Sequence, residues 1–82
     1  MADRPMNLRD LRRAVTRFGG WEEPGRGKGS HTTFFRKHSG GVFSYPVPTH
    51  DKEVKKQYVK GLRQRLALSA EDGVSDDDFY AS

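Results

Sequence analysis

The sequence contains no cysteine and no isoleucine, and other apolar residues are scarce. Without cysteine, disulfide scaffolds and thiolate metal sites are excluded. Leu, Val and Phe number 5, 6 and 5 among 82 residues, so any core is small and aromatic side chains must supply much of it. No apolar run approaches the length of a membrane span, and the first residues lack the apolar stretch of a secretion signal. We therefore expect a small cytoplasmic protein with no membrane segment.

Positive charge is confined to one part of the chain. All 15 Lys and Arg lie in residues 1–66 against six acidic residues, a net charge of +9, whereas residues 67–82 hold five acids and no base. A body this basic favours a polyanionic partner, with nucleic acid ahead of an anionic membrane. The histidines at positions 31, 38 and 50 lack the paired spacing of a zinc site, so we expect no metal and no other cofactor.

Two segments have the apolar spacing of amphipathic helices. The first is residues 7–18, where Asn7 can cap the start. The second is predicted from about residue 51 to about residue 71, with Gly73 as its stop. We expect its cations to form a basic face that is either ordinary solvated surface or a nucleic-acid contact. These cations are Lys52, Lys55, Lys56, Lys60, Arg63 and Arg65.

Three extended segments lie between the helices. A short strand is predicted from Trp21, and residues 30–37 and 42–47 are predicted to form a hairpin around a turn at 38–41. Pro46 cannot donate a backbone hydrogen bond, so its strand should lie at an edge or lose its pairing there. Together the elements predict a small α+β sandwich of α-β-β-β-α order, with two helices on one face of a three-stranded antiparallel sheet.

The clearest chemical signal is Gly-Lys-Gly-Ser-His at residues 27–31. Glycine lets the backbone come close to a phosphate, which its amides and Lys28 can then hold. His31 follows where this loop becomes a strand. An imidazole beside a held phosphodiester suits RNA cleavage through the ribose 2′-hydroxyl, because it can remove the hydroxyl proton. On these residues alone, a Gly-rich turn with a solvated histidine is the commoner interpretation.

Other candidates are more ambiguous. Arg36 and Lys37 add to the cationic surface and are candidates for holding the RNA backbone. His50 precedes the second helix and is either a structural residue or a second acid or phosphate ligand. His38, in the turn, is expected to be only solvated. Phe34–Phe35 must point to opposite sheet faces, so one belongs to the core and the other is free to stack on a base or to cover a partner.

In their order and spacing, these motifs resemble the HicA family of bacterial mRNA interferase toxins. The resemblance spans residues 7–79 and rests on Lys28-Gly29-Ser30-His31, on Val47-Pro48-Thr49-His50 and on the acidic-aromatic ending at 75–79. It implies a fold like the double-stranded-RNA-binding domain and ribosome-independent cleavage of mRNA. It also implies that His31 is catalytic, that no metal takes part, and that a HicB-type antitoxin covers His31 and the cationic surface around it.

We therefore predict a metal-independent, histidine-dependent mRNA endoribonuclease of a toxin–antitoxin pair. The predicted catalytic residue is His31, the predicted RNA-binding and loop residues are Lys28, Gly29, Ser30, Arg36 and Lys37, and His50 is a candidate secondary residue. The alternative function is a non-catalytic module that binds double-stranded or structured RNA.

The chain is expected to divide near residue 73. Residues 1–73 would form the domain that binds and cleaves RNA, and residues 74–82 an acidic extension that packs as a short helical turn or stays flexible. Ser75 can cap such a turn, and Phe79 can fold back onto the core. An autoinhibitory role for the acidic residues is the less favoured alternative.

Overall fold

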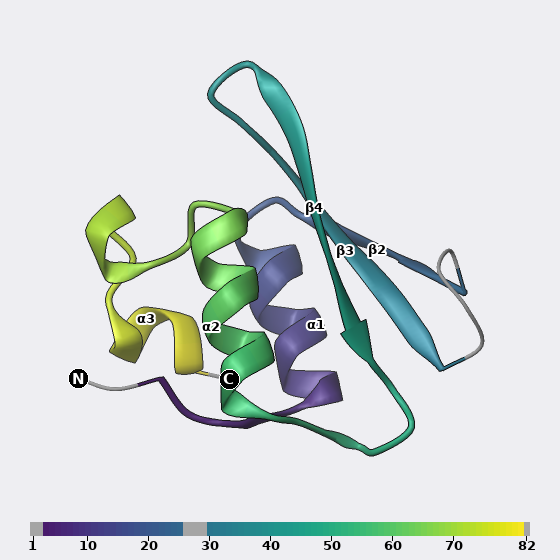
Figure 1. Ribbon diagram of the computed structural model, residues 1–82. Coiled ribbons are helices and arrows are strands. Elements are labelled where there is room, and N and C mark those ends of the chain that lie inside the picture. The colour runs from purple at the N-terminus through teal and green to yellow at the C-terminus, as the bar shows by residue number, and fades with distance from the viewer. Residues whose placement is uncertain (1–2, 26–29, 82) are drawn as a thin grey trace.

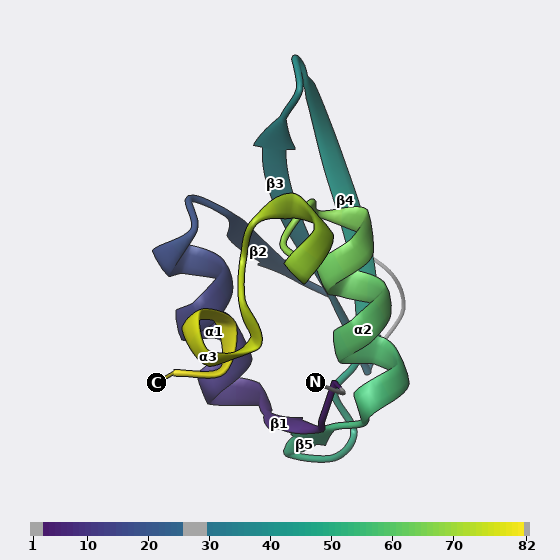
Figure 2. The same cartoon turned by 90° about the vertical axis from the view of Figure 1, so that its left-hand side faces the viewer.

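The computed structural model describes residues 3–25 and 30–81. Its elements are β1 (Met6–Asn7), α1 (Leu8–Arg17), β2 (Trp21–Pro24), β3 (His31–His38), β4 (Gly41–Pro48), β5 (Glu53–Val54), α2 (Lys56–Arg65), the 3₁₀ turn η1 (Ala70–Asp72) and α3 (Asp76–Tyr80). Strands β2, β3 and β4 form an antiparallel sheet in that order, and β1 pairs with β5. Helices α1 and α2 lie side by side against one face of the larger sheet (Figures 1 and 2). The predicted α+β class and this arrangement are confirmed.

The first helix begins where the sequence predicts. Asn7 has an extended backbone, and its side-chain Oδ1 accepts a hydrogen bond from the Arg9 amide at 2.9 Å. This bond satisfies one of the amides that the first helical turn leaves without a partner. The buried residues of α1 are Leu11, Ala14 and Val15, which share the face that meets the core.

Strands β3 and β4 form a long hairpin whose tip projects past the helices (Figure 1). Its turn residues Ser39 and Gly40 have φ values of 52° and 79°, the two positive angles that a type I′ hairpin turn requires. Strand β4 is an edge of the sheet, as Pro46 predicts, because an edge strand can lack one backbone donor. The register pairs His31 with Pro48 and Phe34 with Tyr45.

The second helix is shorter than predicted at both ends. It covers Lys56–Arg65 rather than about 51–71. Before it, Glu53–Val54 pair with Met6–Asn7 as a two-stranded sheet, and after it Ala67 takes a left-handed φ of 57°. The apolar spacing runs through both ends, but pairing with a distant segment and the turn after Leu66 override it.

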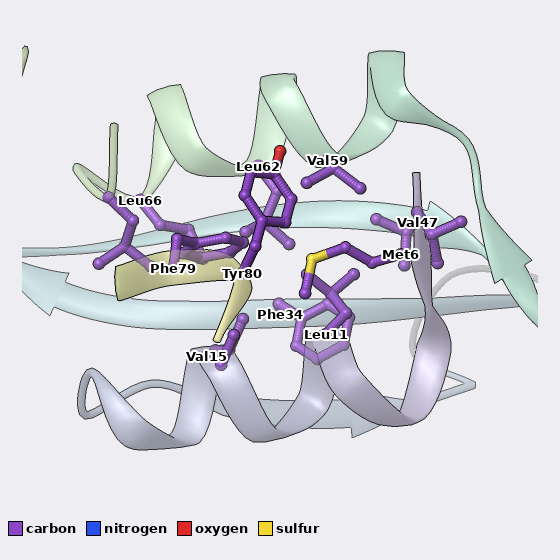
Figure 3. Packing of buried hydrophobic residues seen from close by; sticks show 13 residues of the cluster. Met6, Leu11, Val15, Phe34, Val47, Val59, Leu62, Leu66, Phe79 and Tyr80 are labelled. Atoms are coloured by element: carbon purple, nitrogen blue, oxygen red, sulfur yellow. The ribbon is translucent and has the colours of Figure 1, made fainter. Parts of the chain in front are cut away.

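The core lies between the two helices and the sheet (Figure 3). It comprises Met6, Leu11, Ala14, Val15, Phe34, Val47, Val54, Val59, Leu62, Leu66, Leu68, Phe79 and Tyr80. Phe34 is only 1% exposed, so it is the member of the phenylalanine pair that enters the core. Phe79 and Tyr80 reach the same core from α3, which Ser75 begins by accepting a hydrogen bond from the Asp78 amide.

Gly61 allows α2 to approach the sheet closely. A Cβ placed there would lie 2.6 Å from Cζ of Tyr45, which is closer than side-chain atoms can pack. The cost of glycine within a helix, about 1 kcal/mol relative to alanine, is therefore offset by the contact between α2 and β4.

Arg63 is not part of an exposed basic face, and that prediction is wrong. Its side chain is buried. It donates to the Leu68 and Val74 carbonyls at 2.9 Å each and to Oδ1 of both Asp3 and Asp76 at 2.8 Å. A buried guanidinium with four acceptors joins both chain ends to α2, so this cation serves the fold.

Candidate active site

His31 is the first residue of β3 and follows the sequence Gly-Lys-Gly-Ser at residues 27–30. Its carbonyl accepts a hydrogen bond from the Gly25 amide at 3.2 Å, and the Ser30 carbonyl accepts one from Thr49 at 2.6 Å. The backbone at His31 is thus paired on both sides, toward β2 and toward the end of β4. The imidazole itself is exposed. Of the other predicted loop residues, Ser30 is exposed, whereas Lys28 and Gly29 lie outside the described residues.

His31 belongs to the sheet face that points away from the helices. Phe34 enters the core, and side chains alternate along a strand, so His31, Thr33, Phe35 and Lys37 point the other way. We call this side the open face. By register it comprises Trp21 and Glu23 of β2, these four residues of β3, and Val42, Ser44, Pro46 and Pro48 of β4. Within the described part of the chain, no helix covers it (Figure 1).

The two adjacent cations of β3 lie on opposite faces. Lys37 is exposed on the open face, six residues from His31 and therefore about 20 Å along the strand. Arg36 points toward the helices, where it donates to the Phe18 carbonyl at 3.0 Å and to the Leu66 carbonyl at 2.9 Å. Arg36 thereby satisfies carbonyls at the ends of α1 and α2. The structure does not bring Arg36 together with His31.

His50 lies at the same end of the hairpin as His31. It is two residues beyond Pro48, the register partner of His31, and it is exposed. Its Nε2 is 3.7 Å from Oδ2 of Asp51. A pocket of about 180 Å³ adjoins this segment and is lined by Pro48, His50, Asp51, Glu53, Lys55, Gln57 and Tyr58.

His38 occupies the far end of β3 and is packed, so the prediction of a purely solvated side chain is wrong. Its ring stacks on Phe43 with centroids 4.2 Å apart, and its Nε2 is 3.3 Å from the Arg65 carbonyl. The guanidinium of Arg65 lies over the same Phe43 ring at 5.3 Å. This group stabilises the hairpin tip against the end of α2.

No chemistry is predicted for Trp21 from the sequence, and the structure places its ring against Phe35. The rings are register partners, stacked with centroids 5.6 Å apart and planes 8° apart. The indole nitrogen donates to Oε2 of Glu23 at 3.3 Å. The sequence places Trp21 in a short predicted strand, which is a signal for a functional aromatic residue. It does not identify the stacked ring, because that depends on the register between strands.

The family model for the HicA toxin of bacterial toxin–antitoxin systems matches residues 8–68, well over half of the chain. This protein belongs to the HicA toxin family. The match contains Ser30, His31 and His50 and ends before the acidic tail. No curated protein and no solved structure matched the chain significantly.

Membership in the HicA family makes this chain the toxin of a toxin–antitoxin system, which implies a cognate antitoxin as its partner. At the level of the family, it also supports a nuclease. In residues 3–25 and 30–81, no three His, Asp or Glu side chains gather as a metal-binding group. The helices of those residues are too short and too polar to cross a membrane.

Proposed function

We propose that this HicA-family toxin is a ribosome-independent, metal-independent endoribonuclease that cleaves mRNA in the cytoplasm, with His31 as its catalytic residue. The observation that carries the proposal is the placement of His31. Its imidazole is exposed while its backbone is paired on both sides, directly after the sequence Gly-Lys-Gly-Ser. A catalytic base needs this combination, because it must reach a bound substrate and keep a constant position.

In the proposed reaction, the imidazole of His31 removes the proton from a ribose 2′-hydroxyl. The oxygen attacks the adjacent phosphorus, the bond from phosphorus to the 5′-oxygen breaks, and that oxygen takes up a proton as it leaves. The products are a 2′,3′-cyclic phosphate and a 5′-hydroxyl. His50 is the candidate donor of the second proton, since it lies at the same end of the hairpin.

Phosphate binding is proposed to start at the loop and continue along the sheet. Lys28 and the amides of Gly29 and Ser30 would hold the scissile phosphate. Lys37, about 20 Å away on the same face, would contact a more distant phosphate. We place Arg36 outside these contacts, because its guanidinium already serves the Phe18 and Leu66 carbonyls.

The antitoxin is proposed to be of the HicB type and to cover His31 together with the surrounding cations. One protein that blocks both would exclude substrate from the catalytic base and also neutralise the field that attracts RNA. Such a complex should form more slowly and more weakly at high salt.

Cleavage of labelled RNA by the purified toxin in the presence of EDTA tests the proposal. We expect cleavage to persist in EDTA and His31→Ala to abolish it. His38→Ala is the matched control, because it changes the same residue type in the same strand at the packed end. If the His31→Ala variant cuts RNA as fast as the wild type, the catalytic assignment is wrong. If the wild type binds RNA but leaves it intact, the protein is a binding module.

A further inference from the structure

Resting on the proposed endoribonuclease function, we propose that the Trp21–Phe35 stack on the open face binds an unpaired RNA base and makes the toxin selective for single-stranded RNA. The two rings lie on the same sheet face as His31, and cleavage chemistry itself does not need them. Base binding there would set the class of RNA that the site accepts.

The stack is already formed and partly exposed. Phe35 stacks on one side of the indole, and Trp21 as a whole remains 40% exposed. The hydrogen bond from the indole nitrogen to Glu23 holds the ring in its plane. A base that stacks on the exposed part of the indole would extend an existing stack without ordering a mobile side chain, and bases stack on aromatic rings regardless of their identity.

The stack and the catalytic residue share a strand and a face. Phe35 is four residues from His31 on β3, which corresponds to about 13 Å, and both side chains point away from the helices. A short unpaired stretch of RNA can therefore have its scissile phosphate at His31 and a neighbouring base at Trp21. Lys37 lies two residues further along the same line, where it can meet the next part of the backbone.

Single-stranded RNA is the occupant that the charges and the ring geometry favour. The first 66 residues carry +9, and the carboxylate of Glu23 is engaged by the indole nitrogen. In a duplex each base is already stacked on its neighbours, so its faces cannot reach a protein ring without unstacking. A protein partner, such as the antitoxin, is the competing occupant and is separated by the experiment below.

Trp21 is the only tryptophan in the chain, so its fluorescence reports on this site alone. One probe is a mixed-sequence single-stranded RNA, and the other is a hairpin whose stem pairs that sequence with its complement. Both are titrated into the His31→Ala protein, so that neither RNA is cleaved. We expect the single strand to quench Trp21 emission and the duplex to leave it nearly unchanged at equal saturation. Equal quenching by both RNAs, or by neither, would overturn the proposal. A change produced only by the antitoxin would assign the surface to protein.

Variants of the stack give an independent measurement. Trp21→Ala should weaken binding of the single strand about 5- to 100-fold, whereas Trp21→Phe should keep most of the affinity because a ring remains. Val42→Ala is the matched control, an apolar residue of the same face that is 58% exposed. In wild-type background, Trp21→Ala should raise KM for single-stranded RNA and change kcat little. An unchanged KM would overturn the proposal.

The two proposals fail in different ways. If the wild type cuts RNA but Trp21→Ala binds and cuts identically, the stack is not a base-binding site and the endoribonuclease stands. If RNA quenches Trp21 and no preparation cuts it, the base-binding site stands and the endoribonuclease assignment is wrong.

Discussion

Removing the Arg63 side chain should weaken the whole domain, because this buried cation joins both chain ends to α2. Arg63→Ala deletes four hydrogen bonds, to the carbonyls of Leu68 and Val74 and to the carboxylates of Asp3 and Asp76. It also removes a guanidinium that lies 4.8 Å from the Phe79 ring centroid. Burial by itself lowers the pKa of Arg63, but its hydrogen bonds to the two carboxylates raise it overall, so the group is charged.

The expected loss is about 4 kcal/mol. Hydrogen bonds to charged groups contribute about 1.5–3 kcal/mol each, so adding four of them would exceed the cost typical of removing one partner of a buried ion pair. Water can partly hydrate the two carboxylates that lose their partner in Arg63→Ala, since the side chains of Asp3 and Asp76 are 22% and 14% exposed. Deleting one partner of a buried ion pair typically costs about 3–5 kcal/mol. Small domains have about 0.05–0.15 kcal/mol of stability per residue, so this loss is a large fraction of the total.

Urea unfolding followed by circular dichroism measures the loss, and Lys60→Ala is the matched control. Lys60 is an exposed cation of the same helix, and its removal should change the free energy of unfolding by less than about 0.5 kcal/mol. The loss in free energy of unfolding for Arg63→Lys should lie between those of Arg63→Ala and Lys60→Ala, because one ammonium cannot reach all four acceptors. Hydrogen exchange should show the amides of α3 losing protection first.

A loss below about 1 kcal/mol for Arg63→Ala would show that Arg63 does not hold the chain ends to α2. The buried network would then contribute no more than an ordinary surface ion pair, and the packing of Phe79 alone would hold the C-terminal segment.

Three further predictions concern the fold. Gly61→Ala should destabilise the protein by about 1–3 kcal/mol in urea unfolding, although alanine favours helices, because its methyl group meets Tyr45; unchanged or raised stability would refute the contact. Arg36→Gln, which removes the charge, should lower Tm and leave the salt dependence of RNA binding unchanged, since Arg36 serves helix carbonyls; a shallower salt slope would place it on RNA. Hydrogen bonding to Arg63 lowers the pKa of Asp76 from 3.8, so its contribution is present above about pH 4 and is lost as pH falls through the folded-state pKa. Asp76→Asn should therefore flatten the loss of stability in acid, and parallel curves would contradict this.

Features that depend on neighbouring residues were predictable from the sequence. The Asn7 cap and a turn within residues 38–41 require only local backbone geometry, so residue type indicates them. The edge position of β4 follows from the missing donor of Pro46. The Lys-Gly-Ser-His and Val-Pro-Thr-His motifs indicated the HicA family, which the family match confirmed. The functions of His31 and the loop residues stay predictions.

Features that depend on distant segments were decided only in the folded chain. Alternation showed that Phe34–Phe35 must point to opposite faces, but only the position of the helices selected Phe34 for the core. The residue type of Arg63 and its position in the helix pattern predict an exposed cation, yet acceptors from both chain ends surround it. The pairing of Glu53–Val54 with Met6–Asn7 likewise shortened a helix whose local pattern was continuous.

The order of residues alone thus indicates the α+β class, the local caps and turns, and the motifs that contain His31. The tertiary structure decided which cations remain exposed, and it paired Trp21 with Phe35 on the face that carries His31. These two groups of features differ in how far along the chain their interactions reach. Capping and turn formation act over a few residues, whereas burial, strand register and the pairing of buried charges depend on which distant segments come together.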